Sequence, residues 1–313
     1  MLGGVVVLMG VKDIEEKQFE DYNDVFADIV NVLLFDGKEL IKPEELENSK
    51  DKSRFKATDG TIKEQERDVS KWWRKNKIRL AFLGVENQTK PDPKICLRLY
   101  GYDGAVYKSE YYENVQYPVI TIVLYFNYKR HWKGPKRLLQ GMQVPNELKP
   151  YVNDYKMNLF EVAWLTDKQV EMFKSDFKIV ADYFVQMRKN NDYIPSPEAI
   201  KHVDAIMKLM TALTGDSRFE DEVDQIFKKE GRVVTMCNWL DEAEKRGEKR
   251  GMKIGEKRGE KRGRFELIIQ MVNDNIARKR LTQKLACEDL NIEYREYLAA
   301  KRFMKRYEAL AEE

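Results

Sequence analysis

Acidic and amide side chains at the end of one apolar segment have the types and spacing of a metal site. Glu86 and Gln88 lie two residues apart where this segment ends, and Asp68 precedes the segment expected to pair with it. Two carboxylates held close together repel each other unless a cation or a proton lies between them. Hard oxygen ligands suit Mg²⁺ or Mn²⁺, whose remaining positions go to water and a substrate phosphate. These residues therefore predict a divalent metal site that acts on a phosphate.

A β-hairpin is the element that must bring these side chains together. The two expected strands cover residues 67–73 and 78–88. A turn centred near Asn76 places Gly84 opposite Asp68, and the period-two alternation of strand side chains puts Glu86 on the same face. The glycine leaves room beside the acid pair. A shift of the turn by one residue would break this match, so the geometry leaves a second interpretation open. In that interpretation Asp68 is a solvated surface acid and Glu86 only ends a strand.

Two further acids compete with Asp68 for the same role. Glu66 shares the face of Asp68 if the strand extends that far, and it ranks second, while Glu64 is a third candidate. Only the pairing of the strands separates these choices.

Several motifs in a fixed order resemble one nuclease family. They are Asp68, the stretch GVENQT at 84–89 followed by PDP at 91–93, NDVF at 23–26, LRLYGY at 97–102, the strand and aromatic at 117–132, and the tract with glycine at every fourth residue. The set resembles the D…ExQ form of the PD-(D/E)XK nuclease site. It is similar more narrowly to the Rpn family of recombination-promoting nucleases and transposase-like proteins, over residues 20–263.

The resemblance implies a fold and a set of site residues. The fold is α/β, a PD-(D/E)XK (restriction-endonuclease-like) core with a mixed sheet flanked by helices, followed by an all-helical C-terminal region. The chemistry is Mg²⁺- or Mn²⁺-dependent hydrolysis of a DNA phosphodiester, acting in recombination or transposition. Asp68 and Glu86 would be metal ligands, the main-chain carbonyl of Asn87 a third, and Asp24 a further carboxylate. Gln88, where the superfamily more often has lysine, would orient water.

Basic residues near this site are candidates for contacting nucleic acid. The hairpin tip carries Lys71, Arg74, Lys75 and Lys77, interleaved with two tryptophans that could stack on a base or simply pack. Arg98 could reach the DNA backbone if 94–107 is helical, although a salt bridge to an acid at the sheet edge is an equal alternative.

The rest of the chain divides by composition and periodicity. We expect a start-site extension at 1–12, since translation from Met9 would make the first eight residues an artefact, a nuclease core at 13–165, a helical region at 166–244, a basic tract at 245–264 and C-terminal helices at 265–313. A lysine-rich loop is expected at 38–63, and strands at 117–125 and 158–165.

The basic tract supports a second functional hypothesis. Residues 245–264 hold ten Lys or Arg and three Glu, a local charge of +7, while the whole chain carries only +3. Glycine at every fourth position makes an isolated helix marginal, so either another helix packs on the glycines or the tract is a loose linker. The alternative function is therefore a catalytically weak nucleic-acid-binding or assembly protein, with oligomerisation through the C-terminal helices.

Composition excludes several classes of protein. The three cysteines, Cys96, Cys237 and Cys287, have no paired spacing, and with only two histidines a histidine-based catalytic site is not expected. No apolar run approaches the roughly 18 to 20 residues that span a bilayer. We therefore expect a cytoplasmic protein that binds DNA and no membrane.

Overall fold

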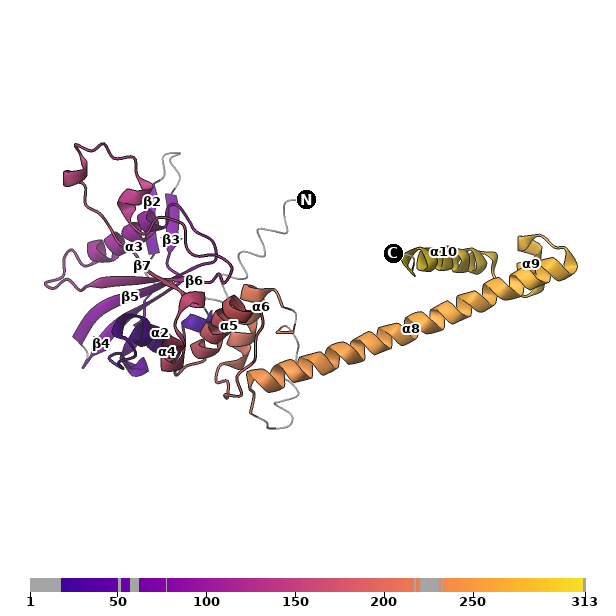
Figure 1. Cartoon of the computed structure of the whole chain (residues 1–313). Coiled ribbons are helices and arrows are strands. Elements are labelled where there is room, and N and C mark those ends of the chain that lie inside the picture. Colours follow the sequence, from indigo (N-terminus) through magenta and orange to yellow (C-terminus); the bar gives the residue numbers. More distant parts are fainter. Residues whose placement is uncertain are drawn as a thin grey trace. The chain divides into compact units, whose positions relative to one another are not determined.

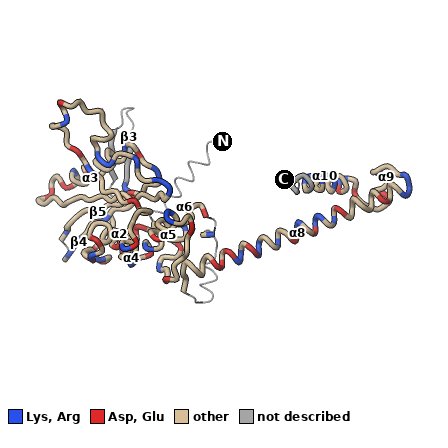
Figure 2. The backbone as a smooth tube through the Cα atoms, viewed as in Figure 1, with Lys and Arg blue, Asp and Glu red and all other residues tan. Residues whose placement is uncertain are grey.

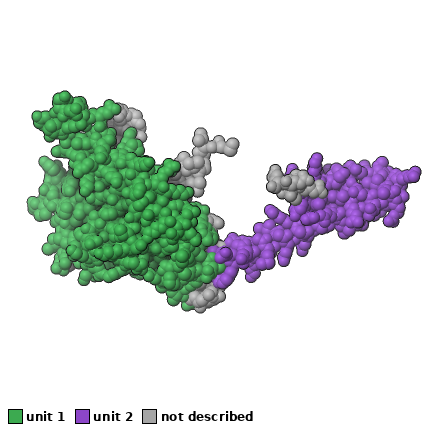
Figure 3. Space-filling model, viewed as in Figure 1, with its two compact units in different colours: residues 1–241 green, residues 242–313 purple. Residues whose placement is uncertain are grey.

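The computed structural model describes residues 18–49, 52–56, 62–76, 78–216, 218–219, 231 and 233–311. The chain forms two compact units, residues 1–241 and residues 242–313 (Figure 3). The start-site extension expected at 1–12 lies outside the described residues, as do Lys77 and, within the helical region expected at 166–244, residues 217, 220–230 and 232. None of the described helices is both long and apolar enough to cross a bilayer.

The first unit contains a five-stranded mixed sheet flanked by helices, which makes it α/β and consistent with a PD-(D/E)XK-like fold (Figure 1). The strands follow the order β1 (Leu46–Asn48), β4 (Val69–Lys75), β5 (Ile78–Gln88), β6 (Val119–Tyr125) and β7 (Asn158–Glu161). Strand β4 is antiparallel to β1 on one side and to β5 on the other. Strands β6 and β7 continue the sheet in parallel with β5. Strands β2 (Lys52–Lys56) and β3 (Ile62–Glu66) form a separate antiparallel pair.

The hairpin of β4 and β5 is confirmed, but its register differs from the expected one by two residues. Gly84 pairs with Ser70 and not with Asp68. One residue of the difference arises at the turn, and a β-bulge between Trp73 and Arg74 adds the second. Asp68 lies in a bend before β4, so the alternation of strand side chains no longer fixes its face, and its position follows from its own contacts.

Alternation along β5 divides its side chains between two helical layers. Trp72 and Phe82 pack with Val106 of α3 (Ile95–Ser109), so the even-numbered residues of β5, including Glu86, face α3. The odd-numbered residues face the other layer, where the ammonium of Lys71 lies 5.6 Å from the ring of Phe26 in α2 (Asn23–Phe35). In Figure 1, α3 lies on one side of the sheet and α2 on the other.

The expected loop at 38–63 is wrong. Its residues include a 3₁₀ turn, η1 (Pro43–Glu45), the edge strand β1, and the β2–β3 pair. The polar composition suggested a loop, but an edge strand with one solvated face tolerates polar residues. Before α2, residues 21–22 separate it from a short helical segment at 18–20.

The helices expected after residue 166 are present with different boundaries. They are α4 (Asp167–Met172), α5 (Phe177–Asn190), α6 (Val203–Thr214), α8 (Met236–Lys279), α9 (Gln283–Asp289) and α10 (Tyr294–Ala311), with short 3₁₀ turns η2 (Leu138–Gly141), η3 (Lys149–Tyr151) and η4 (Val162–Trp164) before them. Helix α8 runs through the basic tract, where no atom lies within 4 Å of a Cβ built on any of its five glycines. Basic and acidic residues alternate along this exposed helix (Figure 2). Within the described residues, neither a packed glycine stripe nor a loose linker is therefore found.

Candidate active site

The backbone of β5 holds Asp68 in place. The amide of Asn87 donates a hydrogen bond of 2.7 Å to Oδ2 of Asp68, which lies in the bend just before β4. The next carbonyl, that of Gln88, accepts from Phe126 on the β6 side. In an extended strand the N–H and C=O of one residue point the same way and those of the next residue point oppositely. The carbonyl of Asn87 therefore points toward the side of Asp68.

Glu86 is buried beside a guanidinium. Its side chain is only 3% exposed and forms an ion pair with Arg98 of α3, which also donates to Asp92 at 2.9 Å. The side-chain amide of Gln88 lies 3.5 Å from Oε1 of Glu86. Burial alone would lower the pKa of Arg98, but the charge of Glu86 raises this pKa above its ordinary value. The positive charge is thus fixed next to the carboxylate.

The phenol of Tyr102 in α3 is influenced by both carboxylates. Burial raises the pKa of Tyr102, and the negative charges of Glu86 and Asp68 raise it further, while Arg98 lowers it. A charge acts on a neighbouring group in this way only over a short distance. Asp68, from the bend before β4, and Glu86, from β5, therefore both lie near the phenol of Tyr102 in α3.

A buried ion pair lies directly behind this point. Arg67, the residue before Asp68, binds Asp103 of α3 at 2.5 Å and Thr121 of β6 at 3.2 Å. Tyr155 donates to the second oxygen of Asp103 at 2.6 Å. No motif in the sequence predicted this network, and an arginine inside an otherwise strand-like segment was the only signal.

Gly84 makes room for this arginine and not for the acid pair. A Cβ at position 84 would lie 2.6 Å from Cδ of Arg67. The guanidinium then lies over the rings of Phe82 and Tyr102, at 5.1 and 5.3 Å from their centroids. The expected role of Gly84 is therefore corrected, because the space beside it is filled by Arg67.

A second acid that the sequence analysis missed contacts the site from the opposite face of the sheet. Glu20 is 1% exposed, and its Oε2 accepts from the side-chain amide of Asn87 at 2.8 Å. Because Asn87 and Glu86 are adjacent in a strand, their side chains point to opposite faces. Glu20 therefore fixes the residue whose main chain holds Asp68.

Asp24, the acid expected from the first helix, has different partners. Its carboxylate accepts from Lys201 at 2.6 Å and lies 3.0 Å from Nε2 of His202. The ring of His202 stacks on Tyr22 with centroids 3.8 Å apart. The structure thus places Asp24 in an ion pair with the segment before α6, whereas Glu20 is the N-terminal acid that contacts β5. The catalytic role expected for Asp24 stays a prediction.

The basic residues expected at the hairpin tip occupy different environments. Lys71 is fully buried, and its ammonium binds Asp21 at 2.9 Å, so the expectation that it contacts DNA is wrong. Arg74 pairs with Glu47 at 2.7 Å, and Lys75 is exposed near the turn. The two tryptophans pack or donate within the fold: Trp72 lies in the core with Phe82, and Trp73 donates to Glu45.

The sequence left two alternatives for Arg98, and the structure contains the salt bridge.

The rival acids Glu64 and Glu66 lie in β3, which pairs with β2 in the separate two-stranded sheet. Their position removes the reason for preferring them, since neither belongs to the sheet that carries Glu86.

The donor set around Asp68 is chemically suited to a hard divalent cation. It offers two carboxylates and a main-chain carbonyl, that of Asn87, on the same side. No group of three His, Cys, Asp or Glu side chains that could hold a metal occurs among the described residues. A site with two carboxylates fits Mg²⁺ or Mn²⁺, which keep several waters and take a substrate phosphate, better than it fits Zn²⁺.

Comparison with known proteins supports the resemblance seen in the motifs. Residues 72–215 match the model of a family described as "Putative transposase, YhgA-like". This part of the chain is similar to that family. No curated protein and no solved structure matches the chain significantly. The segment matched to the YhgA-like family contains Glu86, Asn87, Gln88 and Arg98, and it begins just after Asp68.

Proposed function

We propose that this chain is a divalent-metal-dependent DNA endonuclease that acts in DNA recombination or transposition. The observation that carries the proposal is the hydrogen bond from the amide of Asn87 to Asp68, which holds this carboxylate at the strand residue next to Glu86. The match of residues 72–215 to a family described as "Putative transposase, YhgA-like" supports DNA as the substrate.

The residues of the chain would divide the work between them. Asp68, Glu86 and the Asn87 carbonyl would hold Mg²⁺ or Mn²⁺. When bound, such an ion lowers the pKa of a water ligand and stabilises negative charge on the phosphate. The side-chain amide of Gln88 donates toward Glu86 and can orient water, but it brings no charge of its own.

Arg98 supplies the fixed positive charge that Gln88 lacks. Its guanidinium is anchored by Glu86 and Asp92 and remains about one-third exposed, so one edge is open to a phosphate. Arginine binds phosphate through parallel hydrogen bonds. We therefore assign Arg98 the task of positioning the DNA strand next to the acid pair.

Nicking of a supercoiled plasmid tests the proposal. Wild-type protein, Asp68→Asn and Glu86→Gln are compared in Mg²⁺, Mn²⁺, Ca²⁺ and EDTA, with Glu113→Gln, an exposed acid beyond α3, as the matched control. We expect nicking in Mg²⁺ or Mn²⁺ by the wild type and the control, and at least about 100-fold slower nicking by both site variants. Equal nicking by all four proteins, or none in any metal, would reject the proposal.

A further inference from the structure

The second unit has a hydrophobic core of its own, separate from the acid pair. The end of α8 contributes Ile268 and Val272, and the two short C-terminal helices contribute the rest. The other buried members are Ala286, Cys287, Tyr297 and Ala300. The small residues among them allow α9 and α10 to approach closely. The unit is therefore a three-helix arrangement with α9 and α10 as its last two members.

A short, well-defined turn joins α9 to α10. Thr282 caps the start of α9, the helix ends at Asp289, and four residues separate it from Tyr294, where α10 begins. Asn291 in this turn has a φ of 54°, and the amide of Ile292 donates to the carbonyl of Cys287 at 2.9 Å. A left-handed residue and this back-bond are typical of a helix that ends in a fixed direction. A three- or four-residue turn between two helices is one of the features of a helix-turn-helix.

Helix α8 fixes both of the other helices by polar contacts. Asn275 donates to the carbonyl of Ala286 at 3.2 Å, and Lys279 binds Asp289 at 2.6 Å. On the α10 side, the hydroxyl of Tyr297 donates to Asn273 at 3.1 Å.

Two further contacts run along the length of α10. Arg264 binds Glu296 at 2.5 Å, and the rings of Phe265 and Phe303 lie 5.3 Å apart. One side of α10 is therefore committed to α8, and the opposite side faces outward.

The outward side of α10 is basic. Arg295, Ala299, Arg302 and Arg306 recur at spacings of four and three, so they form one stripe along the helix. All four residues are exposed, and Lys301 and Lys305, also exposed, lie next to the stripe. The acid at the start of this helix, Glu296, is already bound to Arg264.

We propose that α9, the turn and α10 form a helix-turn-helix that binds duplex DNA, with α10 in the major groove. The groove of B-form DNA admits one α-helix, and arginine is the residue that most often reads guanine there. The deep, narrow major groove of double-stranded RNA excludes a helix, which favours DNA. The +7 tract of α8 in the same unit adds attraction for phosphate without regard to sequence. This binding does not depend on the proposed cleavage, because it uses none of the site residues.

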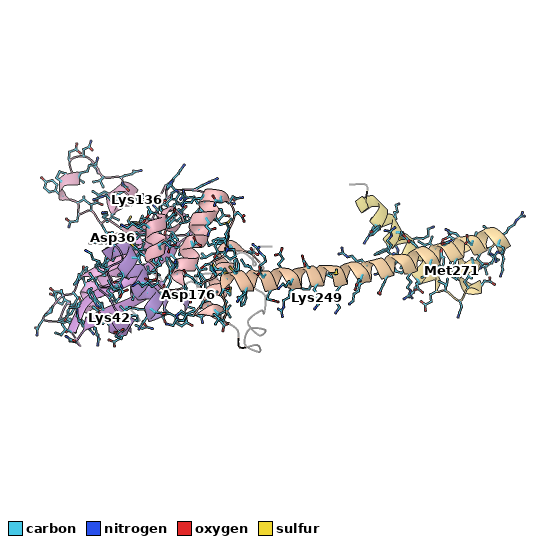
Figure 4. The ribbon with its side chains drawn as sticks, turned by 60° about the horizontal axis from the view of Figure 1, so that its bottom comes forward. Asp36, Lys42, Lys136, Asp176, Lys249 and Met271 are labelled. Carbon is cyan, nitrogen blue, oxygen red and sulfur yellow. The ribbon has the colours of Figure 1, made fainter. Side chains whose placement is uncertain are left out.

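Selection from a random-sequence duplex library tests the proposal. All proteins are full-length, carry Glu86→Gln and are used in EDTA, so that no strand is cut. The test variant adds Arg295→Ala, Arg302→Ala and Arg306→Ala. The matched control instead removes three exposed charges from α8, by Lys249→Ala, Lys253→Ala and Lys257→Ala (Lys249 is labelled in Figure 4). Thermal unfolding followed by circular dichroism verifies that each variant is folded.

We expect the parent and the α8 variant to enrich the same sequence motif, and the α10 variant to enrich none. On the selected duplex, the α10 variant should bind at least about tenfold more weakly. The α8 variant should lose affinity equally for selected and scrambled duplexes. Failure of the parent to enrich a motif, enrichment that survives in the α10 variant, or preference for RNA would each overturn the proposal. If the protein selects a motif but never nicks DNA, that result rejects only the proposed nuclease function.

Discussion

Asp68 accepts a 2.7 Å hydrogen bond from the backbone amide of Asn87, which ties the bend before β4 to the strand that carries Glu86. The two acids are therefore positioned through the main chain of one strand. Arg67 on one face and Glu20 on the other fix the residues on either side of this bond. The site is thus held by buried polar contacts that span three layers of the fold.

Substitution of Gly84 tests the packing of Arg67. A methyl group at this position would lie 2.6 Å from Cδ of Arg67, so Gly84→Ala should displace the arginine. We expect a loss of about 1–3 kcal/mol in the free energy of unfolding, the usual cost of overpacking a core. Urea unfolding measures this loss in the free energy of unfolding. The control is Gly101→Ala in α3, where nothing lies within 4 Å, and helix propensity predicts a gain of up to about 1 kcal/mol. Equal effects at both positions would contradict this interpretation.

Removal of the Arg67 charge should be more costly. Arg67→Met leaves the carboxylate of Asp103 buried without its main cation, which typically costs about 3–5 kcal/mol. The double variant Arg67→Met with Asp103→Leu should recover part of that loss, since neither charge is then stranded. Chemical unfolding of the two proteins measures the difference. If the double variant is less stable by the sum of the two single losses, the residues are not coupled.

The burial of Lys71 predicts that it plays no part in DNA binding. Its ammonium is enclosed by Asp21 and Asn48, so Lys71→Met should leave the salt dependence of DNA affinity unchanged. The exposed Lys75 in the same strand is the matched comparison, and its loss should lower the slope against salt by about 0.9 if it neutralises one phosphate. Fluorescence anisotropy over a salt series measures both slopes. A reduced slope for the Lys71 variant would show that this lysine reaches the DNA.

The ion pair of Asp24 should make stability depend on acid pH. Burial raises the pKa of Asp24, but hydrogen bonds from Lys201 and His202 outweigh it and hold this pKa below its ordinary value. A carboxyl with a depressed pKa stabilises the fold above its unfolded pKa of ~3.9, and the contribution disappears as the pH falls through the folded value. Asp24→Asn should therefore be less stable than the wild type at pH 6. Their stabilities should converge below pH 4, as thermal unfolding over that range would measure, and a constant difference would count against the pair.

Local patterns were sufficient for the elements that carry the site. The hairpin, the helix after PDP and the strand β6 follow from strand composition, turn residues and periodicity, and all three are present. The register was not accessible, because a bulge between Trp73 and Arg74 leaves no clear local signature. The acid pair stays a prediction, since Asp68 lies in a bend outside the paired strand, where the alternation of faces does not apply.

Long-range polar pairing was beyond the reach of sequence patterns. Nothing near Lys71 in the sequence indicates that Asp21 neutralises it, and the contact between Glu20 and Asn87 spans two distant segments. The partners of Arg67 likewise come from α3 and β6. A charged residue in a strand-like segment signals either a solvated face or a buried pair, and only the packed fold distinguishes the two.

Binding of Mn²⁺ by the protein alone tests the central claim most directly. Isothermal titration compares the wild type with Asp68→Asn, Glu86→Gln and the surface control Glu113→Gln, each verified as folded. The account predicts a saturable Mn²⁺ site in the wild type and the control, and affinity reduced by at least about tenfold in both site variants. Unchanged Mn²⁺ binding in Asp68→Asn and Glu86→Gln would contradict the assignment of these two carboxylates as the metal ligands.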